Sequence, residues 1–590
     1  MKKIKLFDLR GILTLFLSLM AFSISAQTVT VSGNIKDDTG FEVIGATVIV
    51  EGDATRGTVT DIDGNYTLAN VPSNGALQIS YVGMRTQVIS VDGRTTIDIL
   101  LTSDTELLDE VVVVGFGTQK KENLTGAVSA VSSDELTARP VNSVVEALQG
   151  VVPGMNISTG ISGGALNSTQ QFNIRGVGTI GTGSSVSPLV LIDGMEGDMN
   201  TLNPNDIESI SVLKDAAASS IYGSRAPGGV ILITTKKGKE GKPTINYNNS
   251  FRFLSPLNMP EMADSYSFAN AINDQLGNGG QAPMYSQNKL QQILDFQQGK
   301  SGQFMWERNG RWNSFDDPER QDIMPAGNTD WLKTHFGNSF TQEHSLSING
   351  GGENVQYYFS GNYLNQGGLL TYGDDSKQRY SVNARINSKL ADWLNMGYTA
   401  RFSRTDYEAP THTGGNDIVW NQFYFDMFRF WPVIPLKDPN GYYTAESQVY
   451  QIQNGGREKT QNDVLTQQLA FTLEPIDNWI TNVELNYKTS NHFRHRDWQT
   501  TYAYDVNEIP YSISNNTTTV NEYAYKSNFF NPNIFTEYST ELGYGHNIKG
   551  LLGFQAEVYT DRNLSGTQDN IAAGIPTLNT TTTNARTGGG

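Results

Sequence analysis

Three stretches of the sequence carry residue types and spacings that could support chemistry. The glycines of Gly176–Gly181 match a dinucleotide-binding loop, and Ser162 within Gly160–Gly164 is spaced like the serine of a nucleophile elbow. Both motifs require a helix that begins directly after them, and no helical pattern follows either one. His492 and His495 are three residues apart and would lie on opposite faces of a strand, which argues against a shared metal ion. The sequence therefore predicts no enzyme activity, no catalytic residue, no cofactor and no metal site.

The composition narrows the class of protein further. The 590 residues include no cysteine, which excludes disulfides, thiolate zinc sites and thiol catalysis. A formal net charge of −18 argues against a nucleic-acid partner, because a phosphate-backbone binder needs a basic face. Charged residues make up only 17%, aromatic residues reach 10% and there are 59 glycines, a profile that favours strands and turns. Beyond the N-terminus no apolar run reaches about 18 residues, so a membrane role would require a β-barrel.

The N-terminal residues have the pattern of a secretory signal. Three lysines precede an apolar run from Gly11 to Ile24, and small residues follow that run. We predict a signal peptide at residues 1–26, with cleavage after Ala26 or after Ser25. The predicted cleavage site lacks the cysteine of a lipoprotein. The chain is therefore expected to be exported.

Residues 27–103 are predicted to form a small β-sandwich, because short apolar runs alternate there with frequent turns. A calcium loop at Asp61–Asn65 is not favoured, since Tyr66 and Pro72 occupy the positions of the required glycine and bidentate glutamate. We expect a hairpin turn instead, with the glycine of this stretch at positive φ. The run from Val31 to Val48 resembles the carboxypeptidase-regulatory-like domain. That resemblance implies a binding or spacer module and no peptidase chemistry.

A hydrophobic run in the following linker could pair with another protein. Residues 104–118 contain two acidic residues followed by four consecutive valines, which strongly favour an extended strand. Such a segment can add itself to the edge of another sheet, where backbone hydrogen bonds provide the affinity. An ordinary core strand is the alternative. The candidate partner-binding residues are Leu108, Asp109, Glu110, Val111, Val112, Val113 and Val114.

The next 120 residues carry several long motifs. They include Phe172–Gly176, Pro188–Gly194, Val212–Ala226 and the closing strand Gly228–Lys236. This region, 119–240, closely resembles the plug domain of TonB-dependent outer-membrane transporters of the SusC/RagA type. The resemblance implies that the valine run is the TonB box, which binds the periplasmic protein TonB with its inner-membrane energising complex. It also implies a SusD-like surface lipoprotein as a second partner.

Two arginines and five aromatic residues complete the set of candidate site residues. Arg175 and Arg225 match plug positions where members of that family keep arginines. Our hypothesis is that they anchor the plug to acidic groups of the barrel wall, and a purely structural role is the alternative. Aromatic side chains in long outer loops could stack on sugars or could simply pack the loops. These aromatic residues are Trp306, Trp312, Tyr424, Phe428 and Trp431.

Residues 241–590 show the alternation of a membrane β-barrel. In Tyr380–Leu390 the even positions are mostly apolar and the odd positions polar, and the pattern resumes at Met396 after a short turn. Apolar residues facing lipid and polar residues facing a wet or plugged lumen would produce this pattern. Long and short connections alternate, which places the short turns in the periplasm. The nine predicted strands lie near 244–253, 340–349, 353–364, 378–390, 396–404, 464–473, 479–489, 536–544 and 548–559.

The expected fold is thus dominated by β-structure. It comprises an N-terminal β-sandwich, an α+β plug domain and the first nine or so strands of an antiparallel transmembrane barrel. Plugged transporters have about 22 strands, so we expect the chain to be truncated within an outer loop. An unclosed sheet leaves edge groups that lipid cannot satisfy. This chain alone is therefore not expected to insert or to transport.

Together these features predict energy-coupled import of a nutrient across the Gram-negative outer membrane. The resemblance implies a glycan as the cargo, with a peptide as the alternative, captured with the SusD-like lipoprotein. The regulatory-like domain and the TonB box would lie in the periplasm, and the barrel would lie in the lipid of the cell outer membrane. The alternatives are a ligand-binding receptor or signal transducer without transport, and a secreted β-adhesin.

Overall fold

The computed structural model divides the chain into two compact units, which are described in turn. The first unit runs to Val112 and includes Thr118–Leu124, and the second holds Val113–Gly117 and the chain from Thr125 onward. No helix among the described residues is long and apolar enough to cross a membrane. The structure describes residues 28–588 except 38–39, 82–83, 103–110, 115–116, 121–126, 160–164, 168–169, 177–186, 216–219, 258, 314–323, 412–422, 424–425, 514–516, 543–545, 572–575 and 579–585.

The first unit contains two small sheets around one apolar core. Strand order is β4-β1-β7 in one sheet and β3-β2-β5-β6 in the other, and the core draws Val31 from the first sheet and Val48 from the second. This arrangement confirms the predicted β-sandwich. Gly64 has a φ of +72°, as the expected hairpin turn requires. The strands are β1 (Thr28–Asp37), β2 (Thr47–Val50), β3 (Asp53–Val59), β4 (Asn65–Pro72), β5 (Ala76–Tyr81), β6 (Met84–Ser90) and β7 (Ile99–Leu101).

The plug region is built on a mixed five-stranded sheet of order β10-β15-β16-β13-β14. The central strands β13 and β16 run parallel and are almost continuously apolar, because both of their faces are covered. Helix α2 begins with a capping box in which Ser132 and Glu135 satisfy each other's backbone N–H groups. The elements are β10 (Val128–Ser132), α2 (Ser133–Thr137), α3 (Val144–Leu148), β11 (Met155–Thr159), β12 (Gln170–Ile174), β13 (Leu189–Ile192), β14 (Met195–Glu196), η3 (Met199–Thr201), η4 (Pro204–Asp206), β15 (Ile207–Leu213), η5 (Ser220–Arg225) and β16 (Val230–Thr235).

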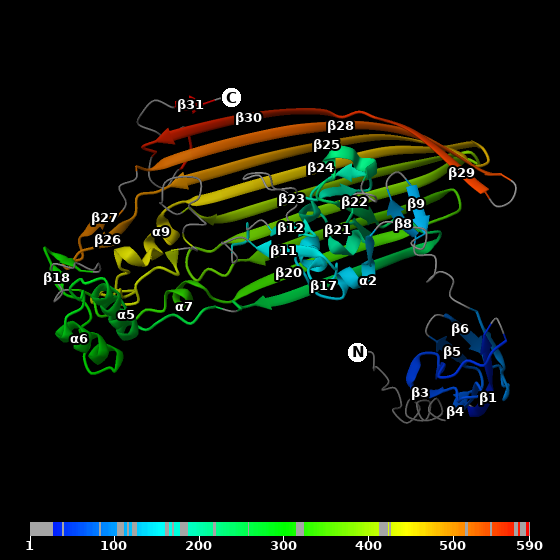
Figure 1. Ribbon diagram of the computed structural model, residues 1–590, viewed down its shortest axis with the longest axis horizontal. Helices are drawn as coiled ribbons and strands as arrows, with labels where there is room; N and C mark the ends of the chain where they lie inside the picture. Colours follow the sequence, from blue (N-terminus) through cyan, green and yellow to red (C-terminus); the bar gives the residue numbers. More distant parts are fainter. Residues whose placement is uncertain are drawn as a thin grey trace, which may run out of the picture. The chain divides into compact units, whose positions relative to one another are not determined.

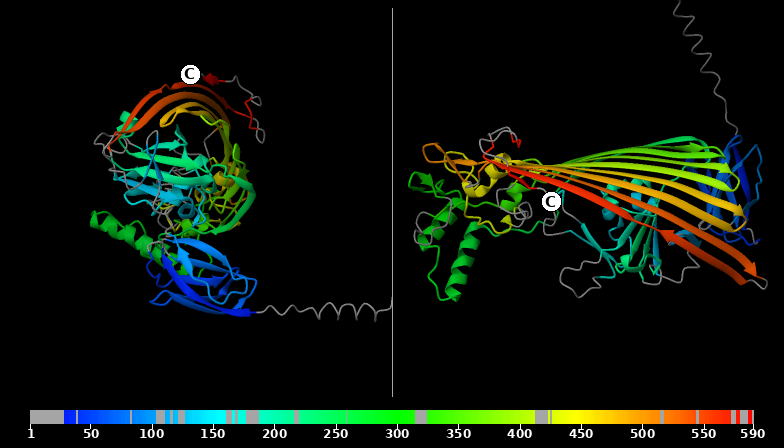
Figure 2. Two further views of the ribbon diagram at one scale, coloured as in Figure 1. Left: turned by 90° about the vertical axis from the view of Figure 1, so that its right-hand side faces the viewer. Right: turned by 90° about the horizontal axis from the view of Figure 1, so that it is seen from above.

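A large antiparallel sheet follows the plug (Figure 1). Consecutive strands pair with one another, and both β29 and β30 pair with β28. The sheet is curved, and the plug strands lie on its concave side (Figure 2). We call this sheet the wall. Its strands are β17 (Gly241–Leu254), β20 (Ser339–Gly351), β21 (Val355–Gly367), β22 (Ser376–Ala391), β23 (Leu394–Pro410), β24 (Arg457–Ile476), β25 (Trp479–Trp498), β28 (Thr519–Leu542), β29 (His546–Gln555), β30 (Val558–Asp569) and β31 (Arg586–Gly588).

Side chains alternate between the two faces of the wall as the sequence predicts. On β22, Ser381 faces the plug and is 8% exposed, whereas Val382 faces outward and is 56% exposed. The ladder pairs Ser381 with Ser403 and Val382 with Phe402, so each face is continuous from β22 to β23. The outward face is therefore apolar along the middle of the strands, as lipid contact requires.

The nine predicted strands correspond to β17, β20 to β25, β28, and β29 together with β30. Their predicted lengths were wrong at the ends that lie away from the short turns. Strand β24 begins at Arg457 and not at residue 464, and β28 begins at Thr519 and not at residue 536. The prediction followed apolar alternation, which stops at the edge of the lipid-facing band. Backbone pairing continues beyond that band through polar residues such as Arg404 and Asp463, which form an ion pair of 2.7 Å.

The long connections carry folded elements of their own. The connection from β17 to β20 contains two helices that contact each other. Their apolar side chains join those of the β23–β24 connection in a shared core around Trp331 and Val433. The elements are α5 (Ser265–Asn278), α6 (Gln287–Gln297), β18 (Glu307–Arg308), β19 (Arg311–Trp312), α7 (Trp331–His335), η7 (Ala445–Ser447), α9 (Val449–Asn454), β26 (Tyr502–Tyr504) and β27 (Pro510–Ser512).

Candidate functional site

Asp193 joins the plug to three strands of the wall. Its carboxylate accepts hydrogen bonds from the backbone N–H and the hydroxyl of Thr235, at 2.9 and 2.8 Å. Arg401 of β23 and Arg385 of β22 form ion pairs with it, the second at 3.4 Å. Gln468 of β24 donates to its backbone carbonyl at 3.0 Å. We call these five residues the Asp193 junction.

The carboxylate of Asp193 is ionised within the protein. Its side chain is only 7% exposed, and burial alone raises the pKa of a carboxyl. The guanidinium groups of Arg401 and Arg385, with the two hydrogen bonds from Thr235, outweigh burial and hold the pKa of Asp193 below its ordinary value. The charge therefore persists at neutral pH, and it compensates two arginines that are themselves almost fully buried.

A second set of buried contacts joins the plug to β17, β20 and β22. Arg252 donates to the carbonyl oxygen of Val141 at 2.9 Å, and Arg379 donates to that of Asn200 at 3.1 Å. Glu343 of β20 lies 2.9 Å from Arg252 and 3.7 Å from Arg379. One wall carboxylate thus compensates two wall arginines, and both arginines bind backbone carbonyls of the plug.

Neutral and acidic plug groups add to this second set. The hydroxyl of Tyr358 on β21 donates to Asp206 at 2.8 Å, and Asn203 donates to Ser345 of β20 at 3.0 Å. Burial raises the pKa of the Asp206 carboxyl, because no guanidinium lies within ion-pair distance of it among the described residues. The wall therefore supplies most of the cations at the interface, and the plug supplies carboxylates and carbonyl oxygens.

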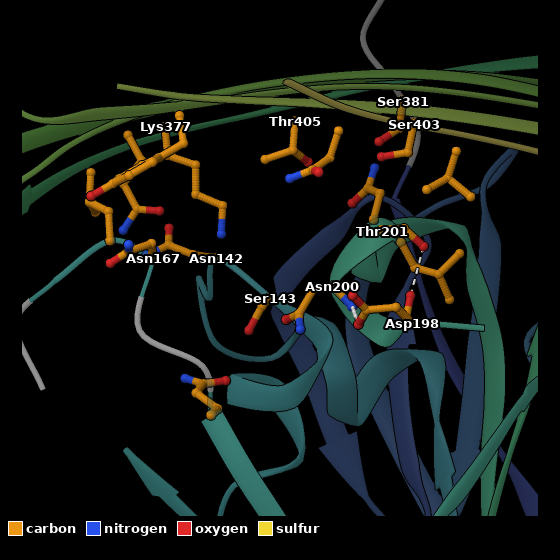
Figure 3. A pocket seen from close by; sticks show the side chains of 18 of the residues that line it. Asn142, Ser143, Asn167, Asp198, Asn200, Thr201, Lys377, Ser381, Ser403 and Thr405 are labelled. Atoms are coloured by element: carbon orange, nitrogen blue, oxygen red, sulfur yellow. Dashed lines mark hydrogen bonds between the residues drawn. The ribbon is translucent and has the colours of Figure 1, made fainter. Parts of the chain in front are cut away.

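Between the plug and the wall, mainly strands β22 to β25, lies a chamber of about 830 Å³. Lys377, Ser381, Ser403 and Thr405 project into it from the wall, facing the plug (Figure 3). Its plug side is formed by the segments that carry Asn142, Ser143, Asn167, Asp198, Asn200 and Thr201. About half of the lining residues carry amides or hydroxyls, which can hydrogen-bond to water or to a neutral polar ligand.

The two arginines predicted as plug anchors lie in different surroundings. Arg225 pairs with Glu196 of the plug and with Glu557, which lies between β29 and β30. Arg175 is exposed in a turn after β12, with a φ of +58°, and its backbone N–H donates to Gly154. Arg175 forms no ion pair with an acidic residue in the part of the chain that the structure describes. Arg225 thus contacts an acidic residue next to the wall strands, and the anchoring role of both arginines stays a prediction.

The valine run forms a strand, as the sequence predicts. Strand β8 (Val111–Val114) pairs with β9 (Gly117–Lys120) in a two-stranded sheet, so one edge of β8 has no strand partner among the described residues. Leu108, Asp109 and Glu110 lie outside the described residues. The assignment of the run as a partner-binding segment stays a prediction.

The candidate ligand-contact aromatics are mostly packed against their neighbours. Lys289 lies 3.5 Å from the centre of the Trp306 ring, and Trp431 packs 5.3 Å from Phe268 between ring centres. Trp312 is half-buried on β19, and Phe428 is 50% exposed. Tyr424 lies outside the described residues. Loop packing accounts for Trp306 and Trp431, and ligand contact stays a prediction for the group.

The Asp193 junction was not identified from the sequence, although a signal for it exists. In the sequence, Asp193 lies within the Pro188–Gly194 motif, and Arg385 and Arg401 lie at polar positions of the alternating strands. Both arginines occupy lumen-facing positions in the middle part of their strands. A buried guanidinium needs a counter-charge, so these arginines indicate an acidic partner inside the sheet.

Comparison with known protein families agrees with this architecture. Residues 120–230 match the TonB-dependent Receptor Plug Domain, and residues 31–113 match the CarboxypepD_reg-like domain. The plug domain, bonded to the concave side of a curved antiparallel sheet, defines the chain as a TonB-dependent receptor.

Within that class the chain belongs to the SusC/RagA type. It is 31% identical over 582 residues to the TonB-dependent receptor SusC of Bacteroides thetaiotaomicron, an alignment that covers 92% of this chain and 51% of SusC. It is 32% identical over 447 residues to the TonB-dependent receptor P3 of Formosa agariphila, covering 75% of this chain and 39% of P3. The chain thus spans about half the length, or less, of the curated relatives it matches.

The fold has a counterpart among solved structures. The RagAB peptide importer in its open-open state aligns with 81% of this chain and 53% of the matched chain, at a TM-score of 0.60 and 23% identity. This likeness confirms the fold class, a plug domain with part of a β-barrel. SusC and P3 are named as receptors and RagAB as an importer, and none of these three names is that of an enzyme.

Proposed function

We propose that this chain is the N-terminal part of a transporter that imports a nutrient across the Gram-negative outer membrane, driven by TonB. The observation that carries the proposal is the plug domain held on the concave side of the wall by buried charged contacts, with a strand-forming valine run just before it. A plug held by many individually breakable polar contacts can close a lumen at rest and yield when its N-terminal end is pulled.

The domain boundaries of this proposal follow the sequence. Residues 1–26 are the signal peptide, 27–103 the regulatory-like domain, 104–118 the linker with the TonB box, 119–240 the plug and 241–590 part of the barrel. The short turns, such as the one between β24 and β25, face the periplasm with the TonB box, and the long folded connections face outward. The transporter is located in the outer membrane, in contact with its lipid.

Energy enters through the TonB box by strand addition. The open edge of β8 can accept a strand of TonB, whose backbone groups would extend the two-stranded sheet. Arg225 contributes to anchoring the resting plug through Glu557. Cargo is captured on the outer side together with a SusD-like lipoprotein. A glycan is the proposed cargo, with a peptide as the alternative, since a solved neighbour of this fold is named as a peptide importer.

Deletion of Leu108–Val114 from the full-length protein tests this proposal. Cells should lose uptake of a glycan or peptide that the intact transporter imports, while binding of that compound at the cell surface is unchanged. Retained uptake would show that the box is misassigned. Surface binding without uptake by the intact protein, in cells with active TonB, would favour the receptor or signal transducer.

A further inference from the structure

The chamber ends where the Asp193 junction begins. Residues of β22 and β23 that line it include Ser381, Ser403 and Arg401. Asn383 of β22 lines it too. The next plug-facing residue of β22 toward the short turn is Arg385, and the corresponding residue of β24 is Gln468. Both of these residues bind Asp193, as Arg401 does. The junction therefore closes the end of the chamber that lies toward the short turns.

Buried polar atoms without partners face this chamber. In the part of the chain that the structure describes, at least one side-chain nitrogen or oxygen atom of each of six lining residues is buried and has no hydrogen-bond partner. Buried polar groups are almost always satisfied by protein, water or ligand. Water or a polar ligand in the chamber would satisfy these atoms. The six residues are Asn142, Gln170, Ser381, Asn383, Ser403 and Tyr407.

Direct contacts join the plug to strands β17, β20 and β21, which supply only a few of the residues that line the chamber. On β17, β20 and β21, the side chains of Arg252, Ser345 and Tyr358 bond directly to plug groups at 2.8 to 3.0 Å. Separation along these strands would break these bonds before any space opened. Most of the wall residues that line the chamber belong to β22 to β25, where Arg379 and Lys488 also bond to plug carbonyls, and the Asp193 junction closes its inner end.

We propose, on the basis of the import function proposed above, that cargo passes between the plug and strands β22 to β25, and that the Asp193 junction is the gate at the periplasmic end of this path. The plug need not leave the barrel for this path to open. The turn that carries Asp193 has to separate from Arg385, Arg401 and Gln468, and the chamber then continues to the periplasmic side.

The first test measures ionic conductance, with potassium chloride as the probe, through the purified full-length protein in a planar lipid bilayer. Asp193→Asn keeps the shape of the side chain and removes its charge. Loss of one partner of a buried ion pair should raise the population of the separated junction about a hundredfold. The conductance should rise by the same factor. Arg401→Gln should act in the same direction. Conductances of both folded variants equal to that of the unaltered protein would overturn the gate.

The second test follows the path itself. The 590 residues contain no cysteine, so Ser403→Cys introduces a single thiol into this part of the chain. In the Asp193→Asn background, a bulky thiol reagent on Cys at position 403 should return the conductance toward the unaltered level. The matched control is Leu485→Cys on the outward face of β25, where the side chain is 39% exposed, and its modification should change nothing. An undiminished conductance after modification at 403 would place the path elsewhere.

A third measurement does not depend on altering the junction. Ser403→Cys in the otherwise unaltered protein should react with a small water-soluble thiol reagent, since the chamber is hydrated. An inert thiol would refute the hydrated path even if the junction variants failed to fold. None of these readouts involves TonB. Uptake that survives deletion of the TonB box would contradict the import mechanism, whereas the conductance results address the path and the gate alone.

Discussion

Glu343 provides a direct test of how the plug is held. Its carboxylate lies 2.9 Å from Arg252 and 3.7 Å from Arg379, and these arginines bind the plug carbonyls of Val141 and Asn200. Glu343→Gln keeps the size of the side chain and removes the charge. Two buried arginines then lose their nearest counter-charge, at the point where they bind the plug.

The expected loss is about 3 kcal/mol of plug–barrel stability, the lower end of the range of about 3 to 5 kcal/mol for breaking a buried ion pair. The lower end applies because Arg252 and Arg379 keep their hydrogen bonds to the plug carbonyls. A loss of this size corresponds to a rise of about a hundredfold in the population of released plug.

The assay is protease accessibility of the plug of the full-length protein across a urea series. The matched control is Glu353→Gln, an exposed carboxylate in the turn between β20 and β21, where the expected effect is below about 1 kcal/mol. A Glu343→Gln protein whose plug becomes accessible at the same urea concentration as the unaltered protein would refute the reasoning.

Three further predictions concern other parts of the second unit. Burial raises the pKa of Asp206, so the folded plug loses stability as pH rises through that pKa and the buried carboxyl ionises. Asp206→Asn should therefore stabilise the plug at pH 7, which a higher urea midpoint of unfolding would show. Burial lowers the pKa of His335 from 6.5 to about 4, so the folded connection from β17 to β20 should lose stability as pH falls from 6.5 to 4. His335→Phe should abolish this loss in thermal unfolding measured over a pH series. A Cβ at Gly238, between β16 and β17, would lie 2.3 Å from the backbone nitrogen of Tyr357. Gly238→Ala should therefore lower the free energy of unfolding by about 1 to 3 kcal/mol. Gly361→Ala, which meets open space, should leave the urea midpoint unchanged and is the control.

The sequence allowed the repeating parts of the fold to be predicted, because each repeats a local rule. Alternation identified the wall strands, including the hairpin around Met396, since every second residue faces lipid. The same rule failed beyond the lipid-facing band. There, pairs such as Arg404 with Asp463 are polar on the outward face, and their strand character depends on the neighbouring ladder.

The contacts between plug and wall could not be predicted in the same way. Asp193 and Arg401 are 208 residues apart in sequence, and neither residue carries a local pattern that points to the other. The hypothesis about Arg175 and Arg225 assumed that the plug supplies cations to an acidic wall. The described contacts have mostly the opposite polarity, with wall arginines binding plug carboxylates and carbonyl oxygens. Charge pairing across a long sequence separation is decided by tertiary packing.

The most direct test of TonB-driven import is contact between the TonB box and TonB in energised cells. Single cysteines placed at Val111, Val112, Val113 and Val114 of the full-length protein can be cross-linked to cysteines in the periplasmic domain of TonB. Strand addition predicts cross-links at these positions, with yields that alternate along the strand, because neighbouring side chains point to opposite faces. The absence of cross-links at all four positions, in cells where the transporter is active, would contradict the account.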